Sequence, residues 1–259
     1  MAGPRVHPTA IVEPGAELAD DVSVGAFAYV ESGARIGPGC ILLPRACVHS
    51  GTVLGARNRI GVGAVLGGDP QDLAYRGERS ELVVGDENWI GEYATLHRAS
   101  GEGARTTVGS RGMFMGYSHV GHNCRVGDQC TITNYSGLAG HASMADGSIL
   151  SGQSMVVQFR RVGRLAFVAA HSRVDQDVPP FVRVVGAPAR IVALNVVGLR
   201  RAGFSAEDRT ALKSVLEAWT GARDLPEGLT GPAAEFAEFT ASASKHGVLR
   251  HRTSQDSAA

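Results

Sequence analysis

The sequence predicts a mainly β protein, in which a parallel β-helix of hexapeptide repeats is followed by a small α-helical C-terminal domain. Three observations support this fold class. An apolar residue recurs every six positions, small residues hold a fixed place between these positions, and glycine is abundant. The chain has 259 residues, of which 34 are glycine and only 6% are aromatic. The core is therefore expected to consist of small and branched aliphatic side chains.

The apolar repeat keeps one phase through three blocks of the chain. Because three hexads make one coil of such a β-helix, residues 18 apart are expected to stack on the same face of neighbouring coils. Every repeat position is apolar: Val6, Val12, Leu18, Val24, Val30, Ile36, Leu42, Val48, Leu54, Ile60 and Leu66, then Val84, Ile90 and Leu96, then Val108, Phe114, Val120, Val126, Ile132, Leu138, Met144, Leu150, Val156, Val162, Val168 and Val174.

Two further positions of the hexad keep the same phase. The residue after the repeat position is often glycine, as at Gly61, which suits a turn with positive φ or a close approach of two backbones. The fourth residue after it is usually small, and Cys40, Cys124 and Cys130 all fall there. These cysteines are therefore predicted to be inward-facing fillers, and no thiol or metal role is assigned to them.

The repeat predicts where the domains begin and end. The β-helix is expected over residues 1–190, with a projecting loop at 68–83 and a shorter interruption at 99–107, where the repeat lapses into polar and glycine-rich sequence. A helical C-terminal domain is expected over 191–248. One helix should start after Ser205, and another should cover 232–245. Residues 249–259 are expected to form a disordered tail.

Charge and hydropathy exclude several classes of function. Lys+Arg and Asp+Glu are both 25, so the broad basic face of a nucleic-acid-binding protein is missing. No stretch approaches the roughly 20 apolar residues of a membrane-spanning helix, and the N-terminus lacks the apolar region of a signal peptide. The four cysteines show no disulfide framework. The expectation is a cytoplasmic protein without nucleic-acid binding or membrane insertion.

Three of the nine histidines, His119, His122 and His141, fall within one short segment. The 18-residue spacing places His122, Gly140 and Gln158 in one column. A basic imidazole would then face a glycine N–H about one coil spacing away, roughly 4.8 Å. A general base and an oxyanion donor are the two parts that acyl transfer from a thioester requires.

The sequence resembles the UDP-N-acetylglucosamine acyltransferases of lipid A biosynthesis, which belong to the hexapeptide-repeat acyltransferases. Matching segments span about residues 5–206. The most specific are QDLAY in the projecting loop, HVGHN, LAGH and GLRRAGFS. The resemblance implies a left-handed β-helix. It further implies a homotrimer with active sites between subunits, and transfer of a (3R)-hydroxyacyl chain from acyl carrier protein to the sugar 3-hydroxyl.

The resemblance assigns roles to individual residues. It makes His122 the general base and Gly140 the oxyanion N–H. No metal or other cofactor is implied. The implied substrate-binding residues are Gln71 and Asp72 in the projecting loop, His97 in the donor channel, His119 and His141 beside the acyl chain and sugar, Gln158 in the base's column, and Asn195 and Arg201 at the UDP group.

The chain departs from the family pattern at four positions. The family usually has Asp after the base, where this chain has Asn123, and polar groups at the positions of Ala74, Val157 and Val197. The acyl-transfer residues are retained while several acceptor-side groups are lost. This predicts a modified acceptor site, for instance one for a 3-amino sugar nucleotide. The acyl chain length stays open.

Three other functions fit parts of the pattern. An acetyl-CoA-dependent sugar acetyltransferase shares the exit segment VVGAPARI. A metal hydrolase of the γ-carbonic anhydrase type uses histidines between subunits, although its paired ligands are spaced HxxxxH rather than HxxH. A non-enzymatic solenoid would need no special column at His122.

An acidic carrier protein would require a basic docking surface. Arginines gather in the last coils and the exit segment, and these supply the predicted patch: Arg160, Arg161, Arg164, Arg173, Arg183 and Arg190.

Overall fold

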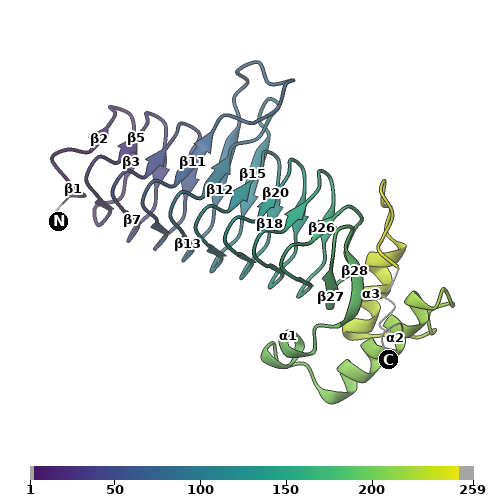
Figure 1. The fold of residues 1–259 in the computed structure, drawn as a ribbon. Helices are drawn as coiled ribbons and strands as arrows, with labels where there is room; N and C mark the ends of the chain where they lie inside the picture. The colour runs from purple at the N-terminus through teal and green to yellow at the C-terminus, as the bar shows by residue number, and fades with distance from the viewer. Residues whose placement is uncertain (1–2, 251–259) are drawn as a thin grey trace.

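The computed structural model describes residues 3–250. It shows a long three-sided β-helix, a projecting loop near its middle and three helices at its C-terminal end (Figure 1). Each side is one sheet in which neighbouring strands are three apart in chain order, until β27 (Val182–Val185) and β28 (Arg190–Leu194) extend the first sheet beyond β25 (Phe167–Val168); all pairs are parallel except β27 with β28. The predicted fold class, a left-handed parallel β-helix followed by a small helical domain, is confirmed.

The three sheets consist mostly of two-residue strands, because the chain turns a corner after each repeat position. Sheet 1 has 11 strands: β1 (Arg5–Val6), β4 (Ser23–Val24), β7 (Ile41–Leu42), β10 (Arg59–Ile60), β13 (Trp89–Ile90), β16 (Met113–Phe114), β19 (Thr131–Ile132), β22 (Ile149–Leu150), β25 (Phe167–Val168), β27 (Val182–Val185) and β28 (Arg190–Leu194). Sheet 2 has nine: β2 (Ile11–Val12), β5 (Tyr29–Val30), β8 (Cys47–Val48), β11 (Val65–Gly68), β14 (Thr95–His97), β17 (His119–Val120), β20 (Gly137–Leu138), β23 (Met155–Val156) and β26 (Arg173–Val174). Sheet 3 has eight: β3 (Glu17–Leu18), β6 (Arg35–Ile36), β9 (Thr52–Leu54), β12 (Glu81–Val84), β15 (Arg105–Val108), β18 (Arg125–Val126), β21 (Ser143–Met144) and β24 (Arg161–Val162).

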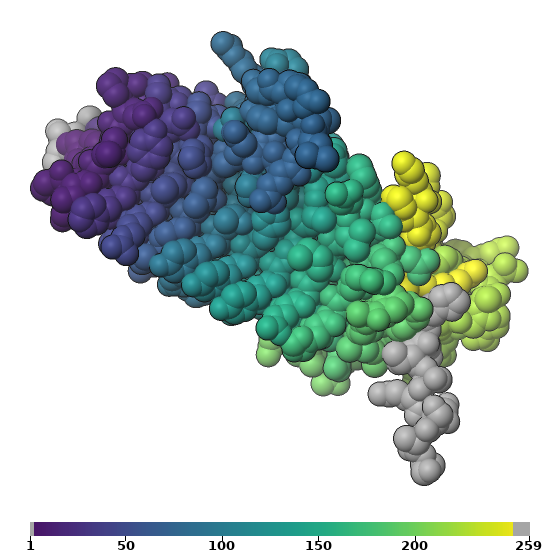
Figure 2. All heavy atoms as spheres, turned by 45° about the horizontal axis from the view of Figure 1, so that its top comes forward, coloured from purple at the N-terminus to yellow at the C-terminus, as the bar shows by residue number. Residues whose placement is uncertain are grey.

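The register confirms the 18-residue coil and locates two insertions. Leu138 pairs with Val156, 18 residues on, whereas Ile60 pairs with Ile90 and Ile90 with Phe114. The larger insertion, residues 69–80, stands out from the solenoid (Figure 2). The second covers residues 98–104. Both loops were predicted to end too late, because residues 81–83 belong to β12 and residues 105–107 belong to β15.

The repeat positions form the core, with Cys40, Cys124 and Cys130 buried among them as predicted. Val6 is 41% exposed because it lies in the first coil, at the open N-terminal end. The glycines after the repeat position serve close approach and not positive φ, except Gly67, whose φ is 74°. A Cβ at Gly61 would lie 2.5 Å from the Gly91 carbonyl carbon.

The helical domain comprises α1 (Val196–Arg201), α2 (Ala206–Thr220) and α3 (Gly231–Ala241). Ser205 caps α2 as predicted, because its hydroxyl accepts from the Asp208 N–H and the Asp208 carboxylate accepts from the Ser205 N–H. The predicted start of the domain was wrong, since β28 pairs antiparallel with β27 before α1 begins. The last helix also ends earlier than residue 245.

Two arginines of the predicted docking patch instead join the helical domain to the solenoid. Arg161 pairs with Asp177 at 2.7 Å, and its guanidinium lies 4.6 Å from the Phe239 ring centroid. Arg164 forms a bidentate pair with Glu235, with distances of 2.6 to 3.0 Å. Their charges are therefore already neutralised within the chain.

The predicted tail begins too early. Leu249 is buried, and its N–H donates to the Asp177 carbonyl at 2.8 Å. The Arg250 guanidinium lies 4.0 Å from the Trp219 ring centroid. The prediction of disorder is therefore wrong for residues 249 and 250. Residues 251–259 lie outside the described part of the chain.

The close contact at Gly61 gives a stability prediction. A Cβ there forces the backbones of two coils apart, so Gly61→Ala should lower the free energy of unfolding by about 1–3 kcal/mol. Gly152→Ala is the matched control, because its Cβ would meet no atom closer than 3.7 Å. Urea unfolding of both variants tests this. Equal stability of the two would contradict the close-approach interpretation.

Candidate active site

The predicted histidine column lies along the corner that follows the strands of sheet 2. His122 and Asn123 occupy the turn after β17, Gly140 and His141 the same turn one coil later, and Gln158 the turn after β23. The register of β17, β20 and β23 is uninterrupted, so these turns stack directly. The Gln158 side chain is exposed at the end of this column.

The His122 imidazole lies against the backbone of Gly140. A Cβ at position 140 would overlap the His122 Nε2, so only glycine leaves room for the ring. His122 is 8% exposed. Within residues 3–250 the Gly140 N–H donates no hydrogen bond, although the Gly140 carbonyl accepts one from the Phe159 N–H. A nearly buried imidazole nitrogen and an unpaired backbone N–H thus lie side by side, as a base and an oxyanion donor require.

Asn123 ties this corner to the second insertion. Its Oδ1 lies 2.8 Å from the His122 Nδ1 and accepts from the Ser100 N–H at 2.9 Å. Its Nδ2 donates to the Ser100 carbonyl at 3.0 Å, and its own N–H donates to the Thr106 Oγ1 at 2.8 Å. Ser100 was not identified from the sequence, because its role depends on the insertion folding back onto the corner; Thr106, on β15, was also not identified.

His119 and His97 continue the histidine cluster along sheet 2. The His119 Nδ1 lies 2.8 Å from the Thr95 Oγ1, and the rings of His97 and His119 are 5.3 Å apart. Burial, together with His97 and His122, lowers the pKa of His119 to about 4. His119 is therefore a neutral imidazole at physiological pH.

His141 lines the same corner from the next coil. Its ring stands perpendicular to that of His122 at 5.2 Å and stacks on Phe159 at 4.6 Å. Partial burial and the neighbouring His122 lower the pKa of His141, while Asp72 opposes the shift. The His141 ring therefore contacts the His122 ring on one side and the Phe159 ring on the other.

The projecting loop brings one carboxylate to the histidines of its own chain. The Ala74 N–H, which donates to Asp72 at 2.9 Å, lowers the pKa of Asp72 most, followed by the Ser100 side chain and then by His122 and His141. Gln71 is exposed, and no contact of its side chain is seen among the described residues. Asp72 thus joins the predicted site, whereas Gln71 faces outward.

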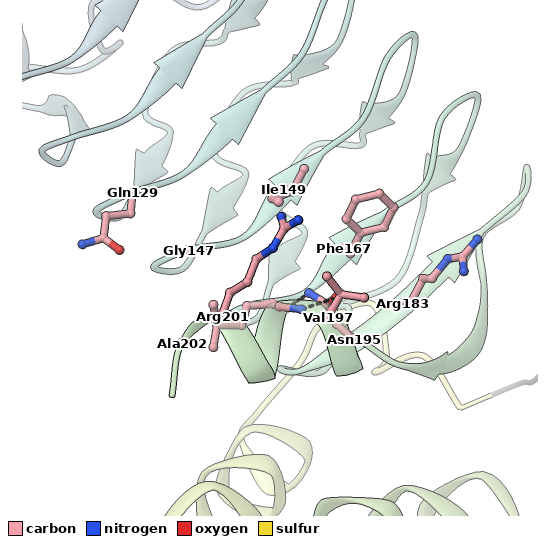
Figure 3. A pocket seen from close by; sticks show the side chains of 11 residues that line it. Gln129, Gly147, Ile149, Phe167, Arg183, Asn195, Val197, Arg201 and Ala202 are labelled. Carbon is pink, nitrogen blue, oxygen red and sulfur yellow. Dashed lines mark hydrogen bonds between the residues drawn. The ribbon is translucent and has the colours of Figure 1, made fainter. Parts of the chain in front are cut away.

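Asn195 and Arg201 line a separate cavity of about 490 Å³ between α1 and the outer face of sheet 1 (Figure 3). Asn195 also has a structural role, because its Oδ1 caps α1 at the Gly198 N–H and its Nδ2 donates to the Leu165 carbonyl. The sequence did not reveal the other lining residues, which include Phe167 and Arg183. They depend on how α1 packs against the sheet.

The two parts of the predicted site lie on different sides of one chain. The histidine column occupies the corner after sheet 2, whereas the α1 cavity is lined by Ile149, Phe167 and Arg183 of sheet 1 and by Gln129 and Gly147 at the corner before it. Sheet 3 separates these two corners. One chain therefore does not bring Asn195 or Arg201 to His122.

No group of three or more His, Cys, Asp or Glu side chains in residues 3–250 is arranged to hold a metal ion. No helix in this part of the chain has the length and apolar character that a membrane crossing demands.

A β-helix of hexapeptide repeats with this histidine and glycine corner is typical of acyltransferases, and the comparisons with known proteins identify the family. A family model described as UDP N-acetylglucosamine O-acyltransferase, domain 2, matches residues 177–248. The acyl-(acyl-carrier-protein) UDP-N-acetylglucosamine O-acyltransferase of Burkholderia orbicola is 38% identical over 261 aligned positions, which cover 95% of this chain and 99% of the relative. The enzyme of that name from Synechocystis sp. is 47% identical over 166 residues, 64% of this chain and 60% of the relative.

The solved structures agree with these relatives. The crystal structure of the Francisella novicida UDP-N-acetylglucosamine acyltransferase matches with a TM-score of 0.87 and 32% identity, over 96% of this chain and 95% of that one. This chain therefore belongs to the family of acyl-(acyl-carrier-protein) UDP-N-acetylglucosamine O-acyltransferases and is an enzyme.

The lowered pKa of His119 predicts a pH-dependent contribution to stability. Its pKa is about 4 in the folded chain, against an ordinary value of 6.5. Between these values the unfolded chain binds the extra proton, so this contribution is complete above pH 6.5 and is lost as the pH falls toward 4. His119→Gln should therefore lose less stability than the wild type over this range in urea unfolding. The exposed His7→Gln is the control, and parallel curves for wild type and His119→Gln would refute the prediction.

Proposed function

We propose that this enzyme transfers a (3R)-hydroxyacyl chain from acyl carrier protein to the 3-position of UDP-N-acetylglucosamine, the first step of lipid A biosynthesis, in the cytoplasm. The observation that carries the proposal is the packing of the His122 imidazole against the Gly140 backbone, whose N–H has no acceptor within residues 3–250. The family membership supplies the substrates, because its members are named for this reaction.

The chemistry is a direct transfer. The His122 Nε2 removes the proton of the acceptor hydroxyl while that oxygen attacks the thioester carbonyl carbon. The Gly140 N–H stabilises the negative charge on the carbonyl oxygen. When the intermediate collapses, the C–S bond breaks and the imidazolium returns its proton to the leaving thiolate. The products are the ester and the free carrier thiol, with no covalent enzyme intermediate.

The proposed acceptor site requires a second copy of the chain. His122 and the α1 cavity with Asn195 and Arg201 lie on different sides of the solenoid, so one sugar nucleotide can reach both only across an interface. We assign the cavity to the UDP group, with Arg201 near its phosphates and the apolar lining beside the base. The closed assembly we propose is a homotrimer.

The other assigned residues surround the reacting centre. Asp72 is placed to accept from a sugar hydroxyl, and His119 and His141 offer neutral imidazoles for hydrogen bonds to sugar and acyl chain. His97, Gln71 and Gln158 are assigned to substrate on the basis of the family resemblance. Val197 lines the α1 cavity at a position where the family usually has an acidic residue. This change on the acceptor side makes the identity of the acceptor atom, oxygen or nitrogen, the first thing to measure.

An acidic carrier protein needs a basic docking surface, and only some arginines of the predicted patch are free to bind it. Arg161 and Arg164 are committed to Asp177 and Glu235. The Arg160 guanidinium donates only to the carbonyls of Asp175 and Gln158, so no carboxylate neutralises it within residues 3–250. Arg173 pairs with Asp175, whereas Arg183 and Arg190, like Arg160, have no carboxylate partner within residues 3–250. Of these three, Arg160 lies two residues after Gln158 of the histidine column, so we assign the docking contact to Arg160.

Product analysis tests the proposed function. The purified protein is incubated with a mixture of hydroxyacyl carrier proteins and either UDP-N-acetylglucosamine or its 3-amino analogue, and the products are analysed by mass spectrometry. An acylated UDP-N-acetylglucosamine is expected. Acylation of the amino sugar alone would reassign the acceptor, and no product from either substrate by an intact oligomer would overturn the proposal.

The general base gives a quantitative prediction. His122→Ala should lower kcat by about 10²- to 10⁴-fold, the usual contribution of a general base, while the protein stays folded. His7 is an exposed histidine in the first coil, so the control variant His7→Ala should keep full activity. A His122→Ala variant with more than about a tenth of wild-type activity would contradict the assignment.

A further inference from the structure

The second insertion, residues 98–104, has no part in the proposed chemistry, yet it contacts the residue beside the base. Both backbone groups of Ser100 bond to the Asn123 side chain, the N–H at 2.9 Å and the carbonyl at 3.0 Å. The Asn123 backbone has φ of 58°, a left-handed conformation that asparagine tolerates better than most residues. Its N–H is held by the Thr106 Oγ1. Asn123 is thus fixed at several points.

This pairing sets the orientation of the Asn123 amide. Only one orientation lets the side chain accept from the Ser100 N–H and donate to the Ser100 carbonyl, and the flipped amide would lose both bonds. Oδ1 therefore faces the His122 Nδ1 at 2.8 Å. An amide oxygen only accepts, so Nδ1 must carry the hydrogen.

The tautomer of the base follows. A neutral imidazole carries one hydrogen, so with Nδ1 protonated the lone pair is on Nε2. Nε2 is also the atom that lies against Gly140. The nitrogen able to accept a proton is therefore the one beside the unpaired N–H.

We propose that Asn123 and the Ser100 backbone form a positioning pair that fixes His122 in its Nδ1–H tautomer without adding a negative charge. The second insertion acts as the support for the base, and its amide pairing with Asn123 replaces an acid at that position. An aspartate could accept from the Ser100 N–H, but its second oxygen would face the Ser100 carbonyl with no hydrogen between them. The inference rests on the proposed function of His122.

Other groups near His122 define its electrostatic surroundings. His119 on β17 and His141 in the turn after β20 are imidazoles, and within residues 3–250 Asp72 of the projecting loop is the carboxylate whose charge interacts with His122 and His141. Asn123 contributes no charge. A carboxylate at position 123 would add a negative charge beside the ring and favour the imidazolium.

Nitrogen-15 NMR of the full-length protein with labelled histidine tests the tautomer directly. The His122 signals are assigned by their loss in His122→Gln. The proposal expects a neutral ring with the hydrogen on Nδ1, and a shift of population toward the Nε2–H form in Asn123→Leu. An Nε2–H ring in the wild type, or an unchanged tautomer in Asn123→Leu, would overturn it. This measurement needs no substrate, so its failure is distinguishable from failure of the proposed function.

Kinetics separate positioning from a merely structural role. Asn123→Leu should lower kcat about tenfold or more with little change in the KM for the sugar nucleotide, as expected when a catalytic histidine is held in the wrong tautomer. Asn123→Asp should move the acid limb of the kcat/KM profile to higher pH by about one unit, because the carboxylate favours the protonated ring. Asn134→Asp adds the same charge at a corner after sheet 1 and should leave the profile in place. Equal profiles for wild type and Asn123→Asp would contradict the proposal.

Discussion

The parallel hydrogen-bond ladders between successive coils determine the position of almost every side chain in the solenoid. Each coil adds one strand to each sheet, so residues one coil apart lie roughly 4.8 Å apart whatever their identity. His122 meets Gly140 for this reason, just as Val120 meets Leu138 in the core. The two insertions respect the same constraint, because each returns the chain to the repeat in phase. Loops can therefore be added at the active corner without disturbing the stack beneath them.

The active corner combines a rigid frame with few charges. Burial and neighbouring imidazoles keep His119 neutral, and Asn123 provides an uncharged partner for His122, the proposed base. Asp72 is the carboxylate that reaches the histidines from the projecting loop. A base surrounded in this way is oriented mainly by hydrogen bonds. The second insertion does not bond to His122 itself; it holds Asn123 through the two backbone groups of Ser100, and we propose that it orients His122 by this route.

The sequence alone predicted the features that depend on the period of six: the core positions, the 18-residue coil and the stacking of His122 on Gly140. It also predicted the cap at Ser205, from the local pattern of a helix start. The pattern could not predict contacts made by its interruptions. Ser100 reaches Asn123 only once the insertion has folded back, and Arg164 meets Glu235, and Arg161 the Phe239 ring, only when the helical domain has docked. The strand β28 was missed because it pairs antiparallel, outside the repeat.

We propose that one corner of the solenoid holds the base and the oxyanion donor for the same reaction. A crystal structure of the enzyme with its acylated sugar nucleotide tests this proposal most directly. We expect the ester oxygen at the sugar 3-position to lie within about 3.2 Å of the His122 Nε2, and the ester carbonyl oxygen at a similar distance from the Gly140 N–H. We also expect the UDP group in the α1 cavity of a neighbouring subunit. A product bound away from His122, or with its carbonyl turned from Gly140, would contradict the proposal.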